Sequence, residues 1–368
     1  MKPIKIIISG GGTGGHIFPA LAIAIGMQKI NLNTSILFVG AKGKMEMEKI
    51  PKAGFLIKGL WISGFQRSLS FENLLFPLKL VISIIQAFRV LKKFKPNIVV
   101  GTGGFASGPL LWVAQLLDLP TILQEQNSYP GFTNRILSKN ASRICVAYDG
   151  MDVFFPKQKI VLTGNPVRND ILNTTAKKAL SLTHFGLNPN LKTILIIGGS
   201  LGARTINESI KDKLKQIKAC NVQLLWQTGS YYFSSMKSAV EREGCLNVFP
   251  QEFIRKMDFA YAVSDVIISR AGALSVSELC IVGKPVILVP SPNVSEDHQT
   301  KNAKSLVDKK AAIHVNDVDS HTKLVELALE LVDNDRFCKE LSTNIKKLAK
   351  PNAAKEIVLE IKKLIVDN

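Results

Sequence analysis

Seven residues near the start of the chain have the types and the spacing of an anion-binding loop. The run Gly10-Gly11-Gly12-Thr13-Gly14-Gly15-His16 follows the apolar residues 4–8 and precedes the stretch 18–24, which is typical of a helix. Such a loop brings unpaired amide groups and the positive end of a helix to one point, and glycine lets the backbone approach a phosphate closely. An imidazole at this place, here His16, titrates near neutrality and is suited to proton transfer.

The loop also matches the dinucleotide-binding fingerprint, because glycines stand at positions 10, 12 and 15. That fingerprint requires an acidic residue about 20 positions further on, at the end of the second strand, to hold the ribose. The second expected strand ends Phe38-Val39-Gly40-Ala41-Lys42, without a carboxylate, and no glycine loop continues into Gly-Lys-Ser or Gly-Lys-Thr. The sequence therefore predicts an anion site at this loop and argues against a nicotinamide cofactor.

A second loop, Ser269-Arg270-Ala271-Gly272-Ala273, opens a helix whose first N–H groups are suited to a diphosphate. Glu278 follows within the same helix, where its carboxylate can accept both hydroxyls of a ribose; the alternative is that it only complements the helix dipole. The polar run 290–299 is bounded by proline and suited to sugar hydroxyls. Further glycine loops at 101–104 and 198–202 bring the total to two in each half of the chain.

The elements that position these loops are apolar strands that alternate with helical patterns, which is typical of βα units and parallel sheets. We expect strands at 4–9, 35–39, 97–100, 120–123 and 143–147, and a second series that begins near Val161 with 193–197, 223–227, 247–249, 266–269 and 285–289. The predicted fold class is α/β, with two doubly wound parallel-sheet domains whose ligands lie at the carboxyl ends of the strands. The expected domains are 1–163 and 164–350, with a hinge at 163–168 and a C-terminal helix in 351–368 that packs back on the first domain.

Composition narrows the class of protein further. A length of 368 residues favours two domains, and five scattered cysteines without a C-x-x-C pair indicate reduced thiols in a cytoplasmic protein. The apolar window 96–117 is broken by a glycine loop, and no signal-peptide pattern opens the chain, so we expect no transmembrane helix. The net charge is +18, and residues 1–165 carry 19 Lys and Arg against 7 Asp and Glu, which favours a polyanionic partner such as an anionic membrane or a nucleic acid.

Six stretches spread over nearly the whole chain resemble one family. They are Gly11-Gly12-Thr13-Gly14-Gly15-His16-Ile17-Phe18-Pro19, 103–109, Gln124-Glu125-Gln126-Asn127, Gly164-Asn165-Pro166-Val167-Arg168, 269–273 and 297–303. On these residues the chain resembles the MurG family of bacterial N-acetylglucosaminyltransferases, GT-B enzymes of peptidoglycan synthesis. The resemblance implies two Rossmann-like domains that face a cleft. It also implies inverting transfer of GlcNAc from UDP-GlcNAc to the MurNAc 4-hydroxyl of lipid I, which gives lipid II, without a metal or a cofactor.

The resemblance further implies roles for single residues. The donor-binding positions are Thr13, Gly14, Gly15, Asn127, Arg168, Ser200, Ile254, Ala273, Leu274, Ser275, Val276, Ser277, Glu278 and Gln299. Among them Ile254 would offer backbone groups to uracil and Gln299 would bind sugar hydroxyls, although His298 departs from the paired glutamines of some relatives. The acceptor-binding positions are Gly11, Gly12, Gly103 and Gly104.

The implied inversion needs a base near the acceptor hydroxyl and positive potential at the leaving UDP. His16 is the preferred base and Glu125 the competing one; the alternative for His16 is that it only orients the loop. No metal is expected, because a helix N-terminus with arginine and serine groups can stabilise the leaving diphosphate. Asp317-Val318-Asp319 precedes a late helix and is interpreted as a cap and turn.

A lipid-linked acceptor implies a peripheral enzyme at the cytoplasmic face of the bacterial inner membrane. Its partners would be UDP-GlcNAc, lipid I, the anionic membrane surface and other cell-wall synthesis proteins, but no nucleic acid. An apolar patch with a basic rim would suit that surface, although a core-facing helix is the alternative. The patch consists of Leu69, Phe71, Leu74, Leu75, Phe76 and Leu78, with Arg67, Lys79, Lys92 and Lys93 around it.

Two other functions compete with this hypothesis. One is another GT-B enzyme that uses UDP-GlcNAc or a UDP-hexose, either a glycolipid synthase or a UDP-GlcNAc 2-epimerase; the epimerase would need an acid/base cluster that the sequence does not suggest. The other is a basic membrane- or nucleic-acid-binding module. That module predicts aromatic residues among basic ones, whereas aromatic residues make up 7% of this chain and concentrate in apolar runs.

Overall fold

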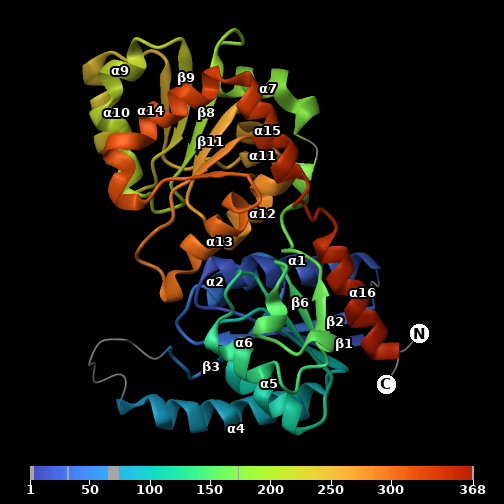
Figure 1. Ribbon diagram of the computed structural model, residues 1–368. Helices are drawn as coiled ribbons and strands as arrows, with labels where there is room; N and C mark the ends of the chain where they lie inside the picture. The colour runs from blue at the N-terminus through green and yellow to red at the C-terminus, as the bar shows by residue number, and fades with distance from the viewer. Residues whose placement is uncertain (1–3, 31–32, 65–73, 173, 367–368) are drawn as a thin grey trace. The chain divides into compact units, whose positions relative to one another are not determined.

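Parallel strands and helices alternate along the chain in the computed structural model, which describes residues 4–30, 33–64, 74–172 and 174–366 (Figure 1). The contacts within the chain divide it into two compact units. Unit 1 consists of Met1–Val167 together with Lys350–Asn368, and unit 2 consists of Arg168–Ala349.

Unit 1 is built on a sheet of parallel strands in the order β3-β2-β1-β4-β5-β6-β7. The strands are β1 (Ile4–Ser9), β2 (Thr34–Ala41), β3 (Leu56–Leu60), β4 (Ile98–Gly101), β5 (Thr121–Glu125), β6 (Arg143–Val146) and β7 (Ile160–Leu162). The strand order reverses between β1 and β4, and ligands of such sheets bind outside the carboxyl ends of the strands at this point.

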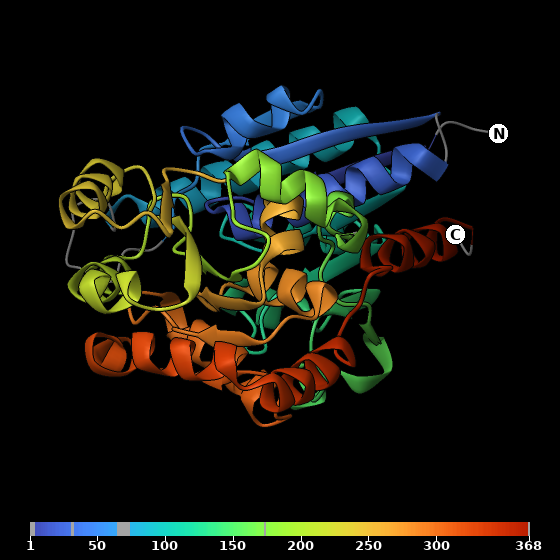
Figure 2. The same ribbon diagram turned by 90° about the horizontal axis from the view of Figure 1, so that it is seen from above.

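Helices cover both faces of this sheet, so its strands are apolar on both sides. The helices are α1 (Gly14–Ile30), α2 (Glu46–Lys52), α4 (Phe76–Phe94), α5 (Ser107–Leu116), α6 (Phe132–Leu137) and α16 (Ala353–Val366). Ile6 and Ile8 pack with α1 and α16, whereas Ile7 packs with α4 and α5 on the other face. Helix α16 contacts α1, so the end of the chain completes the core of unit 1 (Figure 1 and Figure 2).

Unit 2 repeats the same strand order in its own sheet, β10-β9-β8-β11-β12-β13, and its neighbouring strands are again parallel. The strands are β8 (Lys192–Ile197), β9 (Val222–Gln227), β10 (Val248–Gln251), β11 (Val266–Ser269), β12 (Val286–Leu288) and β13 (Ile313–His314). The helices are α7 (Lys178–Phe185), α8 (Arg204–Asp212), α9 (Leu214–Lys218), α10 (Phe233–Glu243), α11 (Met257–Val263), α12 (Ala273–Val282), α13 (His298–Val307), α14 (Ser320–Asp333) and α15 (Asp335–Lys346).

The predicted α/β class with two doubly wound parallel sheets is confirmed. The predicted start of the second series near Val161 is wrong, because β7 pairs with β6 and extends the sheet of unit 1. The sequence does not predict β3 or β13, two edge strands that are short and only partly buried and therefore carry little apolar signal. Within the described ranges, no helix is long and apolar enough to cross a membrane.

Candidate functional site

The first glycine loop lies at the carboxyl end of β1 and holds the His16 ring. His16 Nδ1 lies 3.0 Å from the carbonyl oxygen of Gly11 and 3.2 Å from Thr13 Oγ1. A carbonyl oxygen can only accept a hydrogen bond, so Nδ1 carries the proton and Nε2 is the basic nitrogen of the neutral ring. Gly14 and Gly15 begin α1, where helical geometry leaves N–H groups without intrahelical acceptors.

The second glycine loop of unit 1, after β4, packs directly against the first. A Cβ on Gly103 would lie 3.0 Å from His16 Cδ2, and a Cβ on Gly104 would overlap the Gly11 carbonyl oxygen. Thr102 joins the loops, because its hydroxyl donates to the carbonyl of His16 over 2.8 Å. The structure therefore brings the predicted acceptor-binding glycines together with His16, and two of them make room for its ring and for the carbonyl that holds it.

A buried glutamate that the sequence does not single out occupies the other side of this loop. Glu46, at the start of α2, is fully buried, and its carboxylate accepts hydrogen bonds from the backbone N–H groups of Gly12 and Ala41, each over 3.0 Å. The Gly12 amide, predicted to bind the acceptor, is thus occupied by a protein carboxylate. The sequence does not single out Glu46, because this residue stands five positions after the end of β2. The dinucleotide fingerprint expects its acidic residue at the end of that strand.

Glu125, the competing base, ends β5 and is buried. Its Oε1 accepts from the backbone and side-chain nitrogens of Asn127, at 3.0 and 3.3 Å, and its Oε2 accepts from Gly131 N at 3.2 Å and Asn134 Nδ2 at 2.8 Å. Burial raises the pKa of the Glu125 carboxyl, although these hydrogen bonds lower it in part. Both oxygens therefore hold the loop that carries Asn127.

In unit 2, the predicted diphosphate helix is α12, which begins after Gly272 in extended conformation. Glu278 within it is buried, and it accepts hydrogen bonds from Arg168 Nε at 2.9 Å and from the Tyr261 hydroxyl at 3.0 Å. Burial raises the pKa of Glu278 above its ordinary value of 4.5, and Arg168 and Tyr261 counteract this in part. The structure thus joins two predicted donor residues and adds Tyr261, which in the sequence is one more residue of an apolar helix.

Gln227, which is also absent from the predicted set, links the predicted donor position Ile254 to the residue before another one, Ser200. It ends β9 and is buried; its Oε1 accepts from the Ile254 backbone N–H at 2.9 Å, and its Nε2 donates to the Gly199 carbonyl at 3.1 Å. Gly199 precedes Ser200, which is exposed on the loop after β8. The N–H is one of the Ile254 backbone groups expected to face uracil, and in this structure it donates to a side chain.

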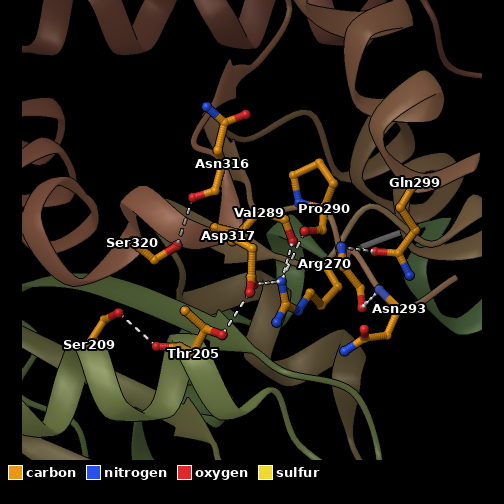
Figure 3. Close-up of polar contacts among 11 residues, drawn as sticks. Thr205, Ser209, Arg270, Val289, Pro290, Asn293, Gln299, Asn316, Asp317 and Ser320 are labelled. Atoms are coloured by element: carbon orange, nitrogen blue, oxygen red, sulfur yellow. Dashed lines mark hydrogen bonds and ion pairs between the residues drawn. The ribbon is translucent and has the colours of Figure 1, made fainter. Parts of the chain in front are cut away.

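Arg270 connects the loop before α12 to the neighbouring strand ends, as Figure 3 shows. Its Nη1 donates to the carbonyl oxygens of Val289 and Pro290, at 3.0 and 3.1 Å, and forms an ion pair with Asp317, which also accepts from the Thr205 hydroxyl at 2.8 Å. Asp317 is thus a partner of Arg270 rather than a simple turn residue. Among the described residues, no three His, Cys, Asp or Glu side chains are grouped to hold a metal ion.

Gln299 lies in α13, and its Oε1 accepts from the backbone N–H of Ser291 over 2.9 Å (Figure 3). This bond ties the predicted sugar-binding glutamine to the chain that follows β12. The amide nitrogen of the same side chain keeps its two donors for another acceptor.

Part of the predicted membrane patch lies on α4 or directly before it. Leu74, Leu75 and Leu78 are exposed, as are Val81, Ile85 and Phe88 further along the helix, whereas Phe76 packs against the core of unit 1. Arg67, Leu69 and Phe71 lie outside the described residues. Leu74 and Leu75 precede α4, and the exposed positions 78, 81, 85 and 88 within it follow the spacing of one helix face, so α4 presents an apolar stripe opposite its buried side.

Family models match both units of the chain. The glycosyltransferase family 28 N-terminal domain matches residues 6–146, and the C-terminal domain of the same family matches residues 193–357. Together with two parallel-sheet Rossmann-like units that carry loops at their strand ends, these matches define a glycosyltransferase of the GT-B class.

Full-length relatives narrow the class. The chain is 53% identical over 368 residues to a UDP-N-acetylglucosamine–N-acetylmuramyl-(pentapeptide) pyrophosphoryl-undecaprenol N-acetylglucosamine transferase of Flavobacterium psychrophilum, with 99% of each chain covered. It is 52% identical to the protein of that name from Parabacteroides distasonis, again with 99% of each covered. The crystal structure of Acinetobacter baumannii MurG superposes with a TM-score of 0.78 at 30% identity and covers 98% of this chain and 100% of its own. The chain belongs to this transferase family, the MurG family within glycosyltransferase family 28.

Proposed function

We propose that this protein transfers N-acetylglucosamine from UDP-GlcNAc to the 4-hydroxyl of the N-acetylmuramyl group of lipid I, giving lipid II. The observation that carries the proposal is the 53% identity to a relative of that named activity over 99% of both chains. The glycine-loop motifs alone do not distinguish this transferase from other GT-B enzymes. The similarity to the named relative extends along the whole chain, and it therefore includes unit 1, which we propose binds the acceptor.

The proposed reaction is a single displacement at the anomeric carbon. The acceptor oxygen forms the new bond to that carbon, the bond to the UDP oxygen breaks with its electron pair, and His16 Nε2 takes the proton of the acceptor hydroxyl. His16 is preferred to Glu125 as the base, because its Nδ1 proton leaves Nε2 basic, while both oxygens of Glu125 hold the Asn127 loop. Glu125 then positions Asn127 toward the transferred sugar.

Groups of unit 2 bind the donor and stabilise its leaving group in this proposal. The N–H groups at the start of α12, with Ser200, carry the diphosphate, and Glu278 accepts the ribose hydroxyls with the lone pairs that Arg168 and Tyr261 leave. Gln299 binds the sugar, and Ile254 lies at the uracil. Since the helix N-terminus and polar side chains supply the positive potential, transfer proceeds without a divalent ion.

Acceptor binding falls to unit 1. The first amides of α1, at Gly14 and Gly15, are the anion-binding groups of the opening loop, because the Gly12 amide is occupied by Glu46. Thr13 lies at the edge of the same loop and contacts the incoming sugar. Gly103 and Gly104 let the acceptor and the His16 ring approach each other closely.

The lipid tail of the acceptor places the enzyme at the cytoplasmic face of the inner membrane. The exposed apolar stripe of α4 would enter the interface, and Lys92 and Lys93 at its end would meet anionic headgroups. One residue of the stripe, Phe88, already lies 5.6 Å below the Lys92 ammonium. This stripe supports a peripheral attachment through unit 1.

The transfer is tested with radiolabelled UDP-GlcNAc and a short-chain lipid I analogue in a buffer with EDTA. We expect labelled lipid II analogue, and we expect His16→Ala to lower kcat by about 10²- to 10⁴-fold. His321→Ala is the control, since this half-exposed histidine pairs with acidic residues of unit 2. If the protein binds UDP-GlcNAc but transfers no GlcNAc to the analogue, lipid I is not its acceptor. Near-normal turnover of His16→Ala would show that His16 is not the base.

Membrane attachment is tested by co-sedimentation with vesicles that contain phosphatidylglycerol. The triple variant Leu78→Ser, Val81→Ser and Ile85→Ser should remain in the supernatant, because these side chains are 51%, 55% and 46% exposed and contribute more to the interface than to the core. The control variant changes three apolar residues outside α4 that are even more exposed, Val153, Leu180 and Leu246, to serine. Equal sedimentation of both variants would rule out the stripe as the attachment.

A further inference from the structure

One peptide group in the first glycine loop is hydrogen-bonded on both sides by side chains. The N–H of Gly12 donates to Glu46 Oε2 over 3.0 Å, and the C=O of Gly11, which belongs to the same peptide group, accepts from His16 Nδ1 over 3.0 Å. A carboxylate, a peptide group and an imidazole therefore form one continuous hydrogen-bonded chain. Glu46 lies 34 positions after Gly12 in the sequence, so only the fold brings them together.

We propose that Glu46 is a positioning residue for His16 and acts through the Gly11–Gly12 peptide group. It keeps the proton of the neutral ring on Nδ1, leaves Nε2 as the basic nitrogen, and stabilises the ring once Nε2 has taken a proton. This inference rests on the proposed function, because that function makes His16 the base.

The electrostatics of the chain support this role. A carboxylate at the N–H end of a peptide group polarises it and makes its carbonyl oxygen a stronger acceptor, an effect of about 10–30% per bond in hydrogen-bonded chains. Glu46 is fully buried, so water does not screen its carboxylate, and both of its oxygens accept hydrogen bonds from backbone N–H groups. The second of these donors, Ala41 N at 3.0 Å, anchors the carboxylate to the end of β2.

Glycines make room for each member of the chain. A Cβ on Gly11 would overlap Glu46 Oε1, and a Cβ on Gly40 would lie 2.5 Å from Glu46 Cγ. A Cβ on Gly104 would overlap the Gly11 carbonyl oxygen that holds His16. Three glycines, two in loops and one in β2, thus serve the approach of a side chain or a carbonyl, which phosphate binding alone does not require.

The tautomer of His16 gives a direct test on the full-length protein. With ¹⁵N-labelled histidine, and His16→Ala to assign the signal among the five histidines, we expect the neutral ring of the wild type to be protonated at Nδ1. In Glu46→Gln the side chain keeps one acceptor and no charge, so the population protonated at Nε2 should rise. A wild-type ring protonated at Nε2, or a His16 signal unchanged by Glu46→Gln, would overturn the proposal.

A double-mutant cycle separates positioning of His16 from general support of the loop. Glu46→Gln should lower kcat on the order of 10-fold with little change in KM for UDP-GlcNAc, as loss of a group that orients a functional histidine does elsewhere. In a His16→Ala background the same substitution should change kcat no further. Equal losses in both backgrounds would show that Glu46 supports only the loop.

Two further variants serve as controls for Glu46→Gln. Glu360→Gln removes another buried carboxylate of unit 1, which pairs with Arg143 and Lys363, and should leave the His16 tautomer and kcat unchanged. If Glu46→Gln does not fold, the His16 tautomer in the wild type tests the proposal by itself. Glu46→Asp keeps the negative charge, so His16 should retain its Nδ1 proton in that variant. The tautomer needs no turnover, so a chain that fails the transfer assay still reports on Glu46.

Discussion

Glu278 has one oxygen on Arg168 and the other on the Tyr261 hydroxyl, and this pair of contacts sets its chemistry. Burial raises the pKa of the Glu278 carboxyl, while burial also raises the pKa of Tyr261 well above its usual value and keeps that hydroxyl a donor. In its proposed role, Glu278 accepts ribose hydroxyls in the ionised form. The donor site therefore depends on a carboxylate that gains a proton more readily than an ordinary glutamate.

Donor affinity should consequently fall on mild acidification. Because the pKa of Glu278 lies above 4.5, protonation sets in at a higher pH than for an exposed glutamate, and UDP-GlcNAc binding weakens there. The same shift means that Glu278 favours the folded state most at low pH, and this contribution is lost as the pH rises through the raised value. Calorimetric titration with UDP-GlcNAc measures the affinity; Glu278→Gln should bind independently of pH over this range, and equal pH dependence in both proteins would contradict the role.

Gln227 supports the donor site in a different way, since it ties Ile254 to the Gly199 carbonyl. Gln227→Ala should raise KM for UDP-GlcNAc roughly 10-fold, because two hydrogen bonds that position the loops are lost. Gln223→Ala is the matched control: this glutamine is also buried in β9, but it holds Asn188 and Thr193. The control should lose stability at unchanged KM, and steady-state kinetics with thermal melts distinguish the two.

At the scale of elements, the carboxyl ends of β1 and β4 determine how closely two loops approach. Gly104 has φ +83°, and a Cβ there would lie 2.3 Å from the Gly11 carbonyl oxygen, so both conformation and space demand glycine. The neighbouring Gly103, at φ +95°, lies against the edge of the His16 ring. Strand order, rather than loop sequence alone, therefore sets the position of His16, the proposed base.

Gly104→Ala should nearly abolish transfer and destabilise the protein by about 1–3 kcal/mol, because the methyl group displaces the Gly11 carbonyl from His16. Gly150→Ala is the control, with φ +72° but open space around its Cβ position. It should cost about 1–2 kcal/mol and leave kcat unchanged. Urea denaturation and the transfer assay measure the two effects, and equal activities of both variants would refute the steric argument.

At the scale of the whole molecule, the chain has separate cores, and one of them is closed by its last helix. Ile357 and Ile361 of α16 are fully buried among residues of α1 and the first sheet. The chain thus leaves unit 1 after Val167, builds unit 2, and returns at Lys350. Stability of unit 1 depends on residues that come almost 200 positions after its last strand.

Ile357→Ala should destabilise unit 1 by about 2–5 kcal/mol, through lost burial and the cavity that remains. Ile210→Ala should do the same for unit 2, since this residue of α8 is 1% exposed in the core of that unit. Differential scanning calorimetry should show each variant lowering a different part of the unfolding transition. UDP-GlcNAc should raise mainly the part that Ile210→Ala lowers, because most of the proposed donor contacts lie in unit 2; an identical response of both variants would contradict independent cores.

Much of this molecule follows from local patterns. Strand β11, Val266–Ser269, has the predicted bounds, and the glycine loops after β1, β4, β8 and β11 stand where the sequence expects them, because apolar runs and glycines act within a few residues. The sequence does not predict the edge strands β3 and β13, because these partly exposed strands do not form a clear apolar run. Arg168 and Glu278, both predicted donor residues, contact each other directly, but their neighbour Tyr261 and the partner of Ile254, Gln227, are concealed in the sequence by apolar or alternating surroundings.

By itself, then, the sequence determines the α/β class, the paired parallel sheets, the loops at their carboxyl ends and the resemblance to one family. Only the tertiary structure decides that the Gly12 amide donates to Glu46, that His16 Nδ1 lies against the Gly11 carbonyl, and that α16 belongs to the core of unit 1. The physical reason is that these are contacts between residues tens to hundreds of positions apart. Strand order and packing create such neighbours, whereas periodicity and glycine spacing report only on what lies nearby in the chain.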